Sequence, residues 1–174
     1  MSKLHPQTLA IRASKEQTPF NEHQQALFLT SSFMADSAAD AAAIFAKTKE
    51  GYTYSRTANP TIAAFQKRIA ALENAEAGIA TATGMAAIQA ALLTFLSAGD
   101  HLVSSRSLFG TTAGLLSGHI ARFGIEITFV SQTDVSEWEK AIRPNTKMLF
   151  LETPSNPLNE VADLEKLAKL AHDN

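Results

Sequence analysis

Short apolar runs alternate with amphipathic stretches from Gly78 to the end of the chain, and this alternation restricts the fold more than any other feature. The apolar runs predict strands at residues 78–83, 101–105, 125–131 and 147–153. The amphipathic stretches predict helices at residues 85–96, 111–123, 135–142 and 163–173. Strands that are regularly separated by helices favour right-handed crossovers and a mainly parallel sheet covered on both faces. We therefore predict an α/β core.

The part of the chain before this core is less regular. A helix is predicted at residues 60–73, because Asn59 can cap its free N–H groups and Pro60 suits the first helical position. Its apolar residues form one stripe: Ile62, Phe65, Ile69 and Leu72. In the first fifty residues only 38–47 has a clear helical pattern. We interpret residues 1–58 as an arm that packs on something else, and residues 59–174 as the α/β domain.

Composition excludes several classes of function. The formal net charge is −2 and Lys and Arg are scattered, so nothing indicates binding to nucleic acid or to an anionic membrane. The apolar stretches are too short and too interrupted to span a bilayer, and no secretory signal opens the chain. There are no cysteines, and the five histidines lack metal-ligand spacing. We expect no metal site and a cytoplasmic location.

Three glycines at four-residue spacing stand out just before and within the helix predicted at 111–123. They are Gly110, Gly114 and Gly118. Each glycine costs about 1 kcal/mol relative to alanine in an exposed helix interior. The spacing therefore predicts a ridge that packs closely against the sheet or against a partner subunit.

Two segments could each bind part of a phosphate group. Thr83-Gly84 lies where a predicted strand gives way to a helix, and the free N–H groups of a helix start favour an anion. Tyr54 and Arg56 alternate in a segment that we expect to be extended, so both side chains would point to the same face. The alternatives are a tightly packed turn at Thr83-Gly84 and an exposed polar strand with Arg56 in a surface ion pair.

A third segment follows the strand predicted at 147–153. It places Glu152 and then Asn156, between Pro154 and Pro157, at the carboxyl end of a parallel strand, where open α/β sheets bind ligands. The alternative is an ordinary proline-rich turn. The sequence contains no G-x-G-x-x-G, P-loop or G-x-S-x-G motif, which argues against dinucleotide-binding, P-loop and hydrolase functions.

Four motifs in order, at residues 52–60, 83–87, 107–112 and 151–157, resemble the Cys/Met-metabolism family of pyridoxal phosphate enzymes. The same motifs resemble those of the cystathionine synthases and lyases, which have the pyridoxal phosphate fold type I. The resemblance covers nearly the whole chain. It implies an amino-terminal arm followed by the first half of the large domain that binds pyridoxal 5'-phosphate, in an enzyme that assembles as a dimer of dimers.

The resemblance also implies roles for particular residues. Tyr54 and Arg56 would reach the cofactor phosphate of a neighbouring subunit, while Gly84 and Met85 would hold the phosphate of their own subunit through backbone N–H groups. Phe109 would stack on the pyridine ring, where most members have Tyr. By the same resemblance Glu152 and Asn156 would lie beside the ring and orient it, with Asn156 near its phenolic oxygen.

Within the family, Phe109 together with Gly114 looks most like the O-succinylhomoserine sulfhydrylases, which exchange succinate for sulfide to give homocysteine. A cystathionine synthase or lyase is the alternative. The chain ends at Asn174, before the family's Schiff-base lysine and its small carboxy-terminal domain. We therefore expect no catalytic residue and no catalysis in this chain alone. A non-catalytic domain that associates with a homologous full-length subunit, or a site for an unrelated phosphate compound, would also fit.

Overall fold

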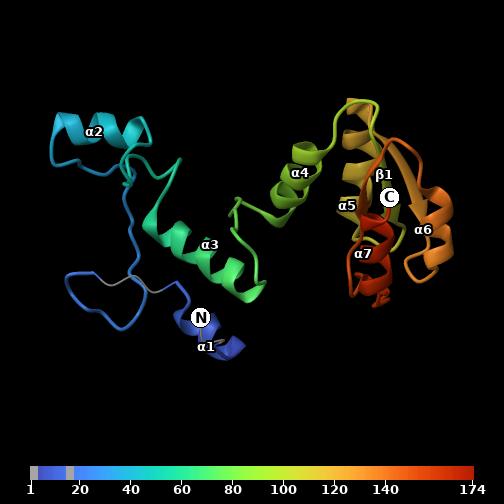
Figure 1. The fold of residues 1–174 in the computed structure, drawn as a ribbon, viewed down its shortest axis with the longest axis horizontal. Helices are drawn as coiled ribbons and strands as arrows, with labels where there is room; N and C mark the ends of the chain where they lie inside the picture. The colour runs from blue at the N-terminus through green and yellow to red at the C-terminus, as the bar shows by residue number, and fades with distance from the viewer. Residues whose placement is uncertain (1–3, 15–17) are drawn as a thin grey trace. The chain divides into compact units, whose positions relative to one another are not determined.

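The computed structural model describes residues 4–14 and 18–174. The chain forms two compact units, residues 1–80 and 81–174 (Figure 1). Residues 1–3 and 15–17, which belong to the predicted arm, lie outside the described residues.

The described residues of the first unit form three helices, and the longest begins where the sequence predicts. The helices are α1 (Pro6–Arg12), α2 (Ala38–Phe45) and α3 (Pro60–Leu72). The side chain of Asn59 caps α3 by accepting a hydrogen bond from the Thr61 N–H at 2.8 Å. Its amide also donates to the Phe28 carbonyl at 3.0 Å and to the Ser55 hydroxyl at 2.9 Å. One buried asparagine thus joins the start of α3 to two other segments.

Two local features of this unit differ from the prediction. Helix α1 was not predicted, although Pro6 at its first position and the His5 side chain at its N-cap are recognisable start signals. The strand predicted at 78–83 does not form, because no neighbouring strand pairs with it among the described residues. Instead Gly78 lies against α3, where a Cβ atom would stand 2.9 Å from the Gln66 carbonyl oxygen.

The second unit is built on a parallel sheet of three strands. They are β1 (His101–Ser105), β2 (Glu126–Val130) and β3 (Thr146–Phe150), in the order β2-β1-β3. The central strand β1 is buried along its whole length. Since all three strands are parallel, their carboxyl ends lie at the same edge of the sheet.

Helices cover both faces of this sheet, as predicted. They are α4 (Gly84–Phe95), α5 (Gly110–Gly114) with its continuation η1 (Leu115–Ile120) and η2 (Ala121–Phe123), α6 (Val135–Ala141) and α7 (Leu164–His172). Leu102 of β1 faces a core with residues of α4 and η1, whereas Val103 faces a second core with Trp138 of α6 and Leu167 of α7. The prediction of an α/β fold with a mainly parallel sheet is confirmed. Within the described residues, no helix has the length and apolar character to cross a membrane.

The glycine ridge does not pack against the sheet, so that part of the prediction is wrong, whereas packing against a partner subunit stays a prediction. A Cβ atom built on Gly110, Gly114 or Gly118 would meet no described atom within 4 Å. The buried positions of the same helical segment include Thr112, Leu116 and Ile120, which lie two residues further along the helix. At 3.6 residues per turn, that offset places the glycines on the opposite side.

Candidate functional site

The amino-terminal end of α4 presents free backbone donors. Thr83 has extended backbone angles and caps the helix, because its hydroxyl accepts from the Ala86 N–H at 3.1 Å. Its carbonyl accepts from the Ala87 N–H at 3.1 Å. The N–H groups of Gly84 and Met85 precede these two and lie in the first turn, where the helix offers them no carbonyl. Two donors at the positive end of a twelve-residue helix are suited to bind an anion.

These donors open into a hollow of about 430 Å³ at the carboxyl edge of the sheet. Three segments that are far apart in the sequence line it. Its lining residues are Thr83, Gly84, Met85, Ile88, Phe109, Thr112, Glu152 and Asn156. All five site residues that the sequence predicted in this unit therefore line one hollow.

Phe109 forms an aromatic wall of this hollow. It is the residue immediately before α5, and its side chain is about half exposed. Thr112, three residues later, is buried and directs its hydroxyl towards the Met85 sulfur at 3.9 Å. This contact connects the start of α5 to the start of α4. Phe109, at the start of α5, thus lies beside the anion-binding donors at the start of α4.

Glu152 connects the two loops that border the hollow. One carboxylate oxygen accepts from the Phe109 N–H at 3.2 Å, and the other accepts from the Asn156 N–H at 3.1 Å. The side chain of Glu152 therefore positions the aromatic residue and the amide residue relative to each other. The side chain of Asn156 is exposed, and the peptide bonds before Pro154 and Pro157 are cis.

The strand before this loop is shorter than predicted. Strand β3 ends at Phe150 rather than at Thr153, so Glu152 belongs to the loop. Phe150 pairs with Ser104 of β1, which ends one residue later at Ser105, so the residues after Phe150 lack a neighbouring strand to pair with. In the loop that follows, the Thr153 hydroxyl accepts a hydrogen bond from the Ala162 N–H at 3.0 Å.

Ile88 and Thr112 line the hollow but were not predicted as site residues. Helical spacing could have found both. Ile88 follows Gly84 by four residues, and Thr112 follows Phe109 by three. Residues at such separations lie on the same face of a helix.

Tyr54 and Arg56 belong to the first unit, where a turn brings them together. The Arg56 guanidinium lies 5.2 Å from the centre of the Tyr54 ring. The predicted extended backbone is wrong here, because the N–H groups of Thr57 and Ala58 both donate to the Tyr54 carbonyl, at 2.9 and 3.1 Å. Both side chains are exposed. Within the described part of the chain, no carboxylate forms a salt bridge with Arg56.

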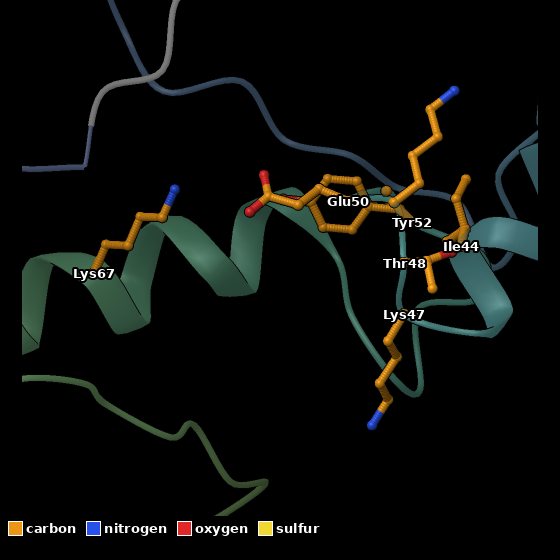
Figure 2. A pocket seen from close by; sticks show the side chains of 8 residues that line it. Ile44, Lys47, Thr48, Glu50, Tyr52 and Lys67 are labelled. Carbon is orange, nitrogen blue, oxygen red and sulfur yellow. The ribbon is translucent and has the colours of Figure 1, made fainter.

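The first unit also contains a larger hollow, of about 640 Å³, whose charged groups do not converge (Figure 2). In Figure 2 the Lys67 side chain points upward and the Lys47 side chain points downward, so their ammonium groups do not meet. Lys49 is paired with Asp40 at 2.6 Å, and this ion pair lowers the pKa of the Asp40 carboxyl. An anion at this place would not meet several cations at once, so the hollow at the sheet edge remains the better candidate site.

The fold and the site together define a class. This is an α/β protein with a helix start, an aromatic ring and an amide gathered at the carboxyl edge of a parallel sheet. The family model described as Cys/Met metabolism PLP-dependent enzyme matches residues 7–174, and the chain belongs to this family. Its members are enzymes that depend on pyridoxal phosphate.

Curated relatives point to the same family. O-succinylhomoserine sulfhydrylase of Pseudomonas aeruginosa is 50% identical over 165 residues, which cover 95% of this chain and 41% of the relative. L-methionine gamma-lyase of Fusobacterium nucleatum is 42% identical over 167 residues, which cover 96% of this chain and 42% of the relative. The chain thus spans less than half the length of the curated relatives it matches.

Solved structures share the fold. A Campylobacter jejuni protein described as an O-acetylhomoserine (thiol)-lyase, which carries a pyridoxyl-lysine monophosphate, matches with a TM-score of 0.90 and 32% identity. A cystathionine gamma-lyase of Lactobacillus plantarum in complex with L-serine matches with a TM-score of 0.86 and 33% identity. Each match covers 98% of this chain and 42% of the solved chain.

Proposed function

We propose that the hollow at the sheet edge binds pyridoxal 5'-phosphate. The observation that carries this proposal is that residues from three separate motifs line one hollow. The chemistry of the residues fits the ligand. Two free N–H groups at a helix start suit a phosphate, an exposed aromatic ring suits a pyridine face, and an amide suits the ring's phenolic oxygen.

Each residue has a distinct task in this proposal. The N–H groups of Gly84 and Met85 hold the phosphate, and the Phe109 ring stacks on one face of the pyridine and excludes water from it. Asn156 orients the ring from its edge. Glu152 positions Phe109 and Asn156, since both of its oxygens are bonded to their N–H groups. Bound pyridoxal phosphate supplies an electron sink for chemistry at substrate carbon atoms.

We further propose that Tyr54 and Arg56 serve the phosphate of a second copy of the chain. Two observations support this role. The Arg56 guanidinium lies 5.2 Å from the centre of the Tyr54 ring, and both side chains are exposed. A guanidinium and a phenol are both suited to phosphate oxygens, and the guanidinium can form two parallel bonds. The site would then require two chains.

For the reaction of the whole protein, we propose the exchange of succinate for sulfide on O-succinylhomoserine. The 50% identity to the Pseudomonas aeruginosa sulfhydrylase supports it, as does the combination of Phe109 with Gly114. A methionine gamma-lyase is the second candidate, favoured by the 42% identity to the Fusobacterium nucleatum enzyme.

Isothermal titration calorimetry with three ligands tests the proposed binding. We expect pyridoxal phosphate to bind more tightly than either pyridoxal or inorganic phosphate, because it engages both the helix start and Phe109. Phe109→Tyr should preserve this preference and Phe109→Ala should reduce it, with little change in the affinity for inorganic phosphate. Equal affinities for pyridoxal phosphate and inorganic phosphate would show that the ring is not recognised.

An assay of the protein purified from its source separates the two candidate reactions. The proposal predicts homocysteine from O-succinylhomoserine and sulfide at a rate well above the cleavage of methionine. The opposite ranking would favour the gamma-lyase. Absence of both activities in a protein that binds pyridoxal phosphate would contradict both reactions.

A further inference from the structure

A largely buried network of polar side chains, none of which lines the hollow, joins the carboxyl ends of all three strands. Ser105 ends β1, Gln132 follows β2, and Glu160 belongs to the loop after β3. The Ser105 hydroxyl donates to the Gln132 side-chain oxygen at 2.9 Å, and the Gln132 amide donates to the Glu160 carbonyl at 2.7 Å. Gln132 is only 1% exposed. Such an amide is costly to bury unless its hydrogen bonds are made, and here both of its ends are satisfied.

Glu160 is the centre of this network, because it reaches both loops that border the hollow. Its backbone is bonded to Ser155 in two ways. The Ser155 N–H donates to the Glu160 carbonyl, and the Glu160 N–H donates to the Ser155 hydroxyl, both at 3.0 Å. These bonds close a turn that contains Asn156. The carboxylate of Glu160 accepts from the Ser107 hydroxyl at 2.5 Å, two residues before Phe109.

The two bordering loops are therefore joined twice. Glu152 joins them at the hollow itself, through the N–H groups of Phe109 and Asn156. Glu160 joins them outside the lining of the hollow, and Gln132 anchors Glu160 to the end of β1 through Ser105. Neither Gln132 nor Glu160 lines the hollow.

We propose that Gln132 and Glu160 are positioning residues of the site, which set the separation between Phe109 and Asn156 without touching a ligand. The identity of the ligand rests on the proposed function, but the positioning role does not. The phosphate end of the hollow belongs to α4, which the network does not contact among the described hydrogen bonds. Loss of the network should therefore affect recognition of the ring and leave recognition of the phosphate unchanged.

Two substitutions test the role of the network. Gln132→Met keeps the volume of the side chain and removes both of its hydrogen bonds. Glu160→Ala removes the bond to Ser107, whereas Glu160→Gln keeps an oxygen acceptor for it and should rescue the effect. We expect Gln132→Met and Glu160→Ala each to weaken pyridoxal phosphate binding about tenfold, the equivalent of one buried hydrogen bond, and to leave inorganic phosphate binding unchanged.

Leu167→Ala is the matched control, because Leu167 packs in the core on the same face of the sheet as the neighbouring Trp138 but belongs to no part of the network. It should lower the melting temperature without changing the ratio of the two affinities. Equal losses of pyridoxal phosphate and phosphate binding in Gln132→Met, or no loss at all, would overturn the positioning role.

Amide hydrogen exchange without ligand separates this proposal from the function it rests on. In Gln132→Met and Glu160→Ala the N–H groups of Phe109, Ser155 and Asn156 should exchange faster, while those of α4 should be unaffected. Unchanged exchange would refute the positioning role whatever the protein binds. A wild-type protein that fails to bind pyridoxal phosphate, but whose variants show faster exchange, would refute only the proposed function.

Discussion

Gly84 contributes a backbone N–H group, not a side chain, to the hollow. The effect of losing this N–H can therefore be tested separately from the effect of adding a side chain. It is the first residue of α4, and a Cβ atom built there meets nothing within 4 Å. The first helical position tolerates proline, because its N–H has no partner in the helix. Thr83, the residue before it, already has the extended backbone that proline requires of its predecessor.

Gly84→Pro should therefore remove one donor and leave α4 intact. A hydrogen bond to a charged group contributes about 1.5–3 kcal/mol, so we expect the affinity for pyridoxal phosphate to fall at least about tenfold. The affinity for pyridoxal, which lacks the phosphate, should not change. Calorimetry of the two ligands measures both effects.

Gly84→Ala is the control for this variant, because it adds a carbon atom in open space and keeps the N–H. It should bind pyridoxal phosphate like the wild-type protein. If the alanine variant loses as much affinity as the proline variant, the backbone donor is not what holds the ligand.

At the scale of secondary-structure elements, the sequence predicted the helices whose first turn is marked by a capping residue. Helices α3, α4, α6 and α7 begin within one residue of the predicted positions, since Asn59, Thr83, Asp134 and Asp163 cap them with side-chain oxygens. The strand at 78–83 could not be predicted correctly in the same way, because a strand exists only where another strand pairs with it. The extent of β3 depends likewise on its partner β1, which ends at Ser105 and leaves no strand for the residues after Phe150 to pair with.

His101 joins the three strands at the edge opposite to the hollow. It is fully buried, and its ring nitrogens lie 2.8 Å from the Thr146 hydroxyl of β3 and 2.9 Å from the Thr128 hydroxyl of β2. Burial lowers the pKa of the imidazole below its ordinary value of 6.5, and Arg143 lowers it further, while Glu126 acts in the opposite direction. Just below pH 6.5 the His101 imidazole therefore stays neutral in the folded protein, whereas the same imidazole is already protonated in the unfolded chain.

This difference predicts how the stability of the sheet depends on pH. The contribution of neutral His101 is complete above pH 6.5 and is lost as the pH falls below that value, because the unfolded chain takes up the proton first. Urea unfolding should give a lower free energy of unfolding at about pH 5 than at about pH 7.5. At the higher pH, His101→Gln should be less stable than the wild-type protein. Its free energy of unfolding should fall less than that of the wild-type protein between the higher and the lower pH. An equal loss in both proteins would show that His101 is not responsible.

At the scale of the whole molecule, the five site residues in residues 81–174 line one hollow, whereas Tyr54 and Arg56 belong to the other unit. Strand ends and a helix start indicated Gly84, Glu152 and Asn156 from the sequence pattern, whereas Met85 and Phe109 were indicated by the family resemblance. The sequence could not predict their mutual bonds. That the Glu152 carboxylate binds the N–H of a residue 43 positions earlier depends on the order β2-β1-β3, in which β1 and β3 are neighbours.

Mixing two defective variants tests whether the site needs two chains. Arg56→Ala and Gly84→Pro should each bind pyridoxal phosphate weakly. The first variant lacks the guanidinium that binds the phosphate in the second copy, and the second variant lacks the backbone N–H that binds the phosphate in its own copy. Randomly mixed dimers should regain about a quarter of the tight sites, since half of the dimers are mixed and each has one intact site of two. No recovery after unfolding and refolding the variants together, with recovery in a refolded wild-type control, would assign both residues to one chain.

The most direct test of the central claim is the backbone amide spectrum of the protein during titration with pyridoxal phosphate. Binding in the hollow predicts the largest shifts at Gly84 and Met85, with further shifts at Phe109 and Asn156. Inorganic phosphate should shift only the first two. Shifts confined to the region around Lys47, Lys49 and Lys67, or an unchanged spectrum at Gly84 and Met85, would contradict the claim that this hollow holds the cofactor.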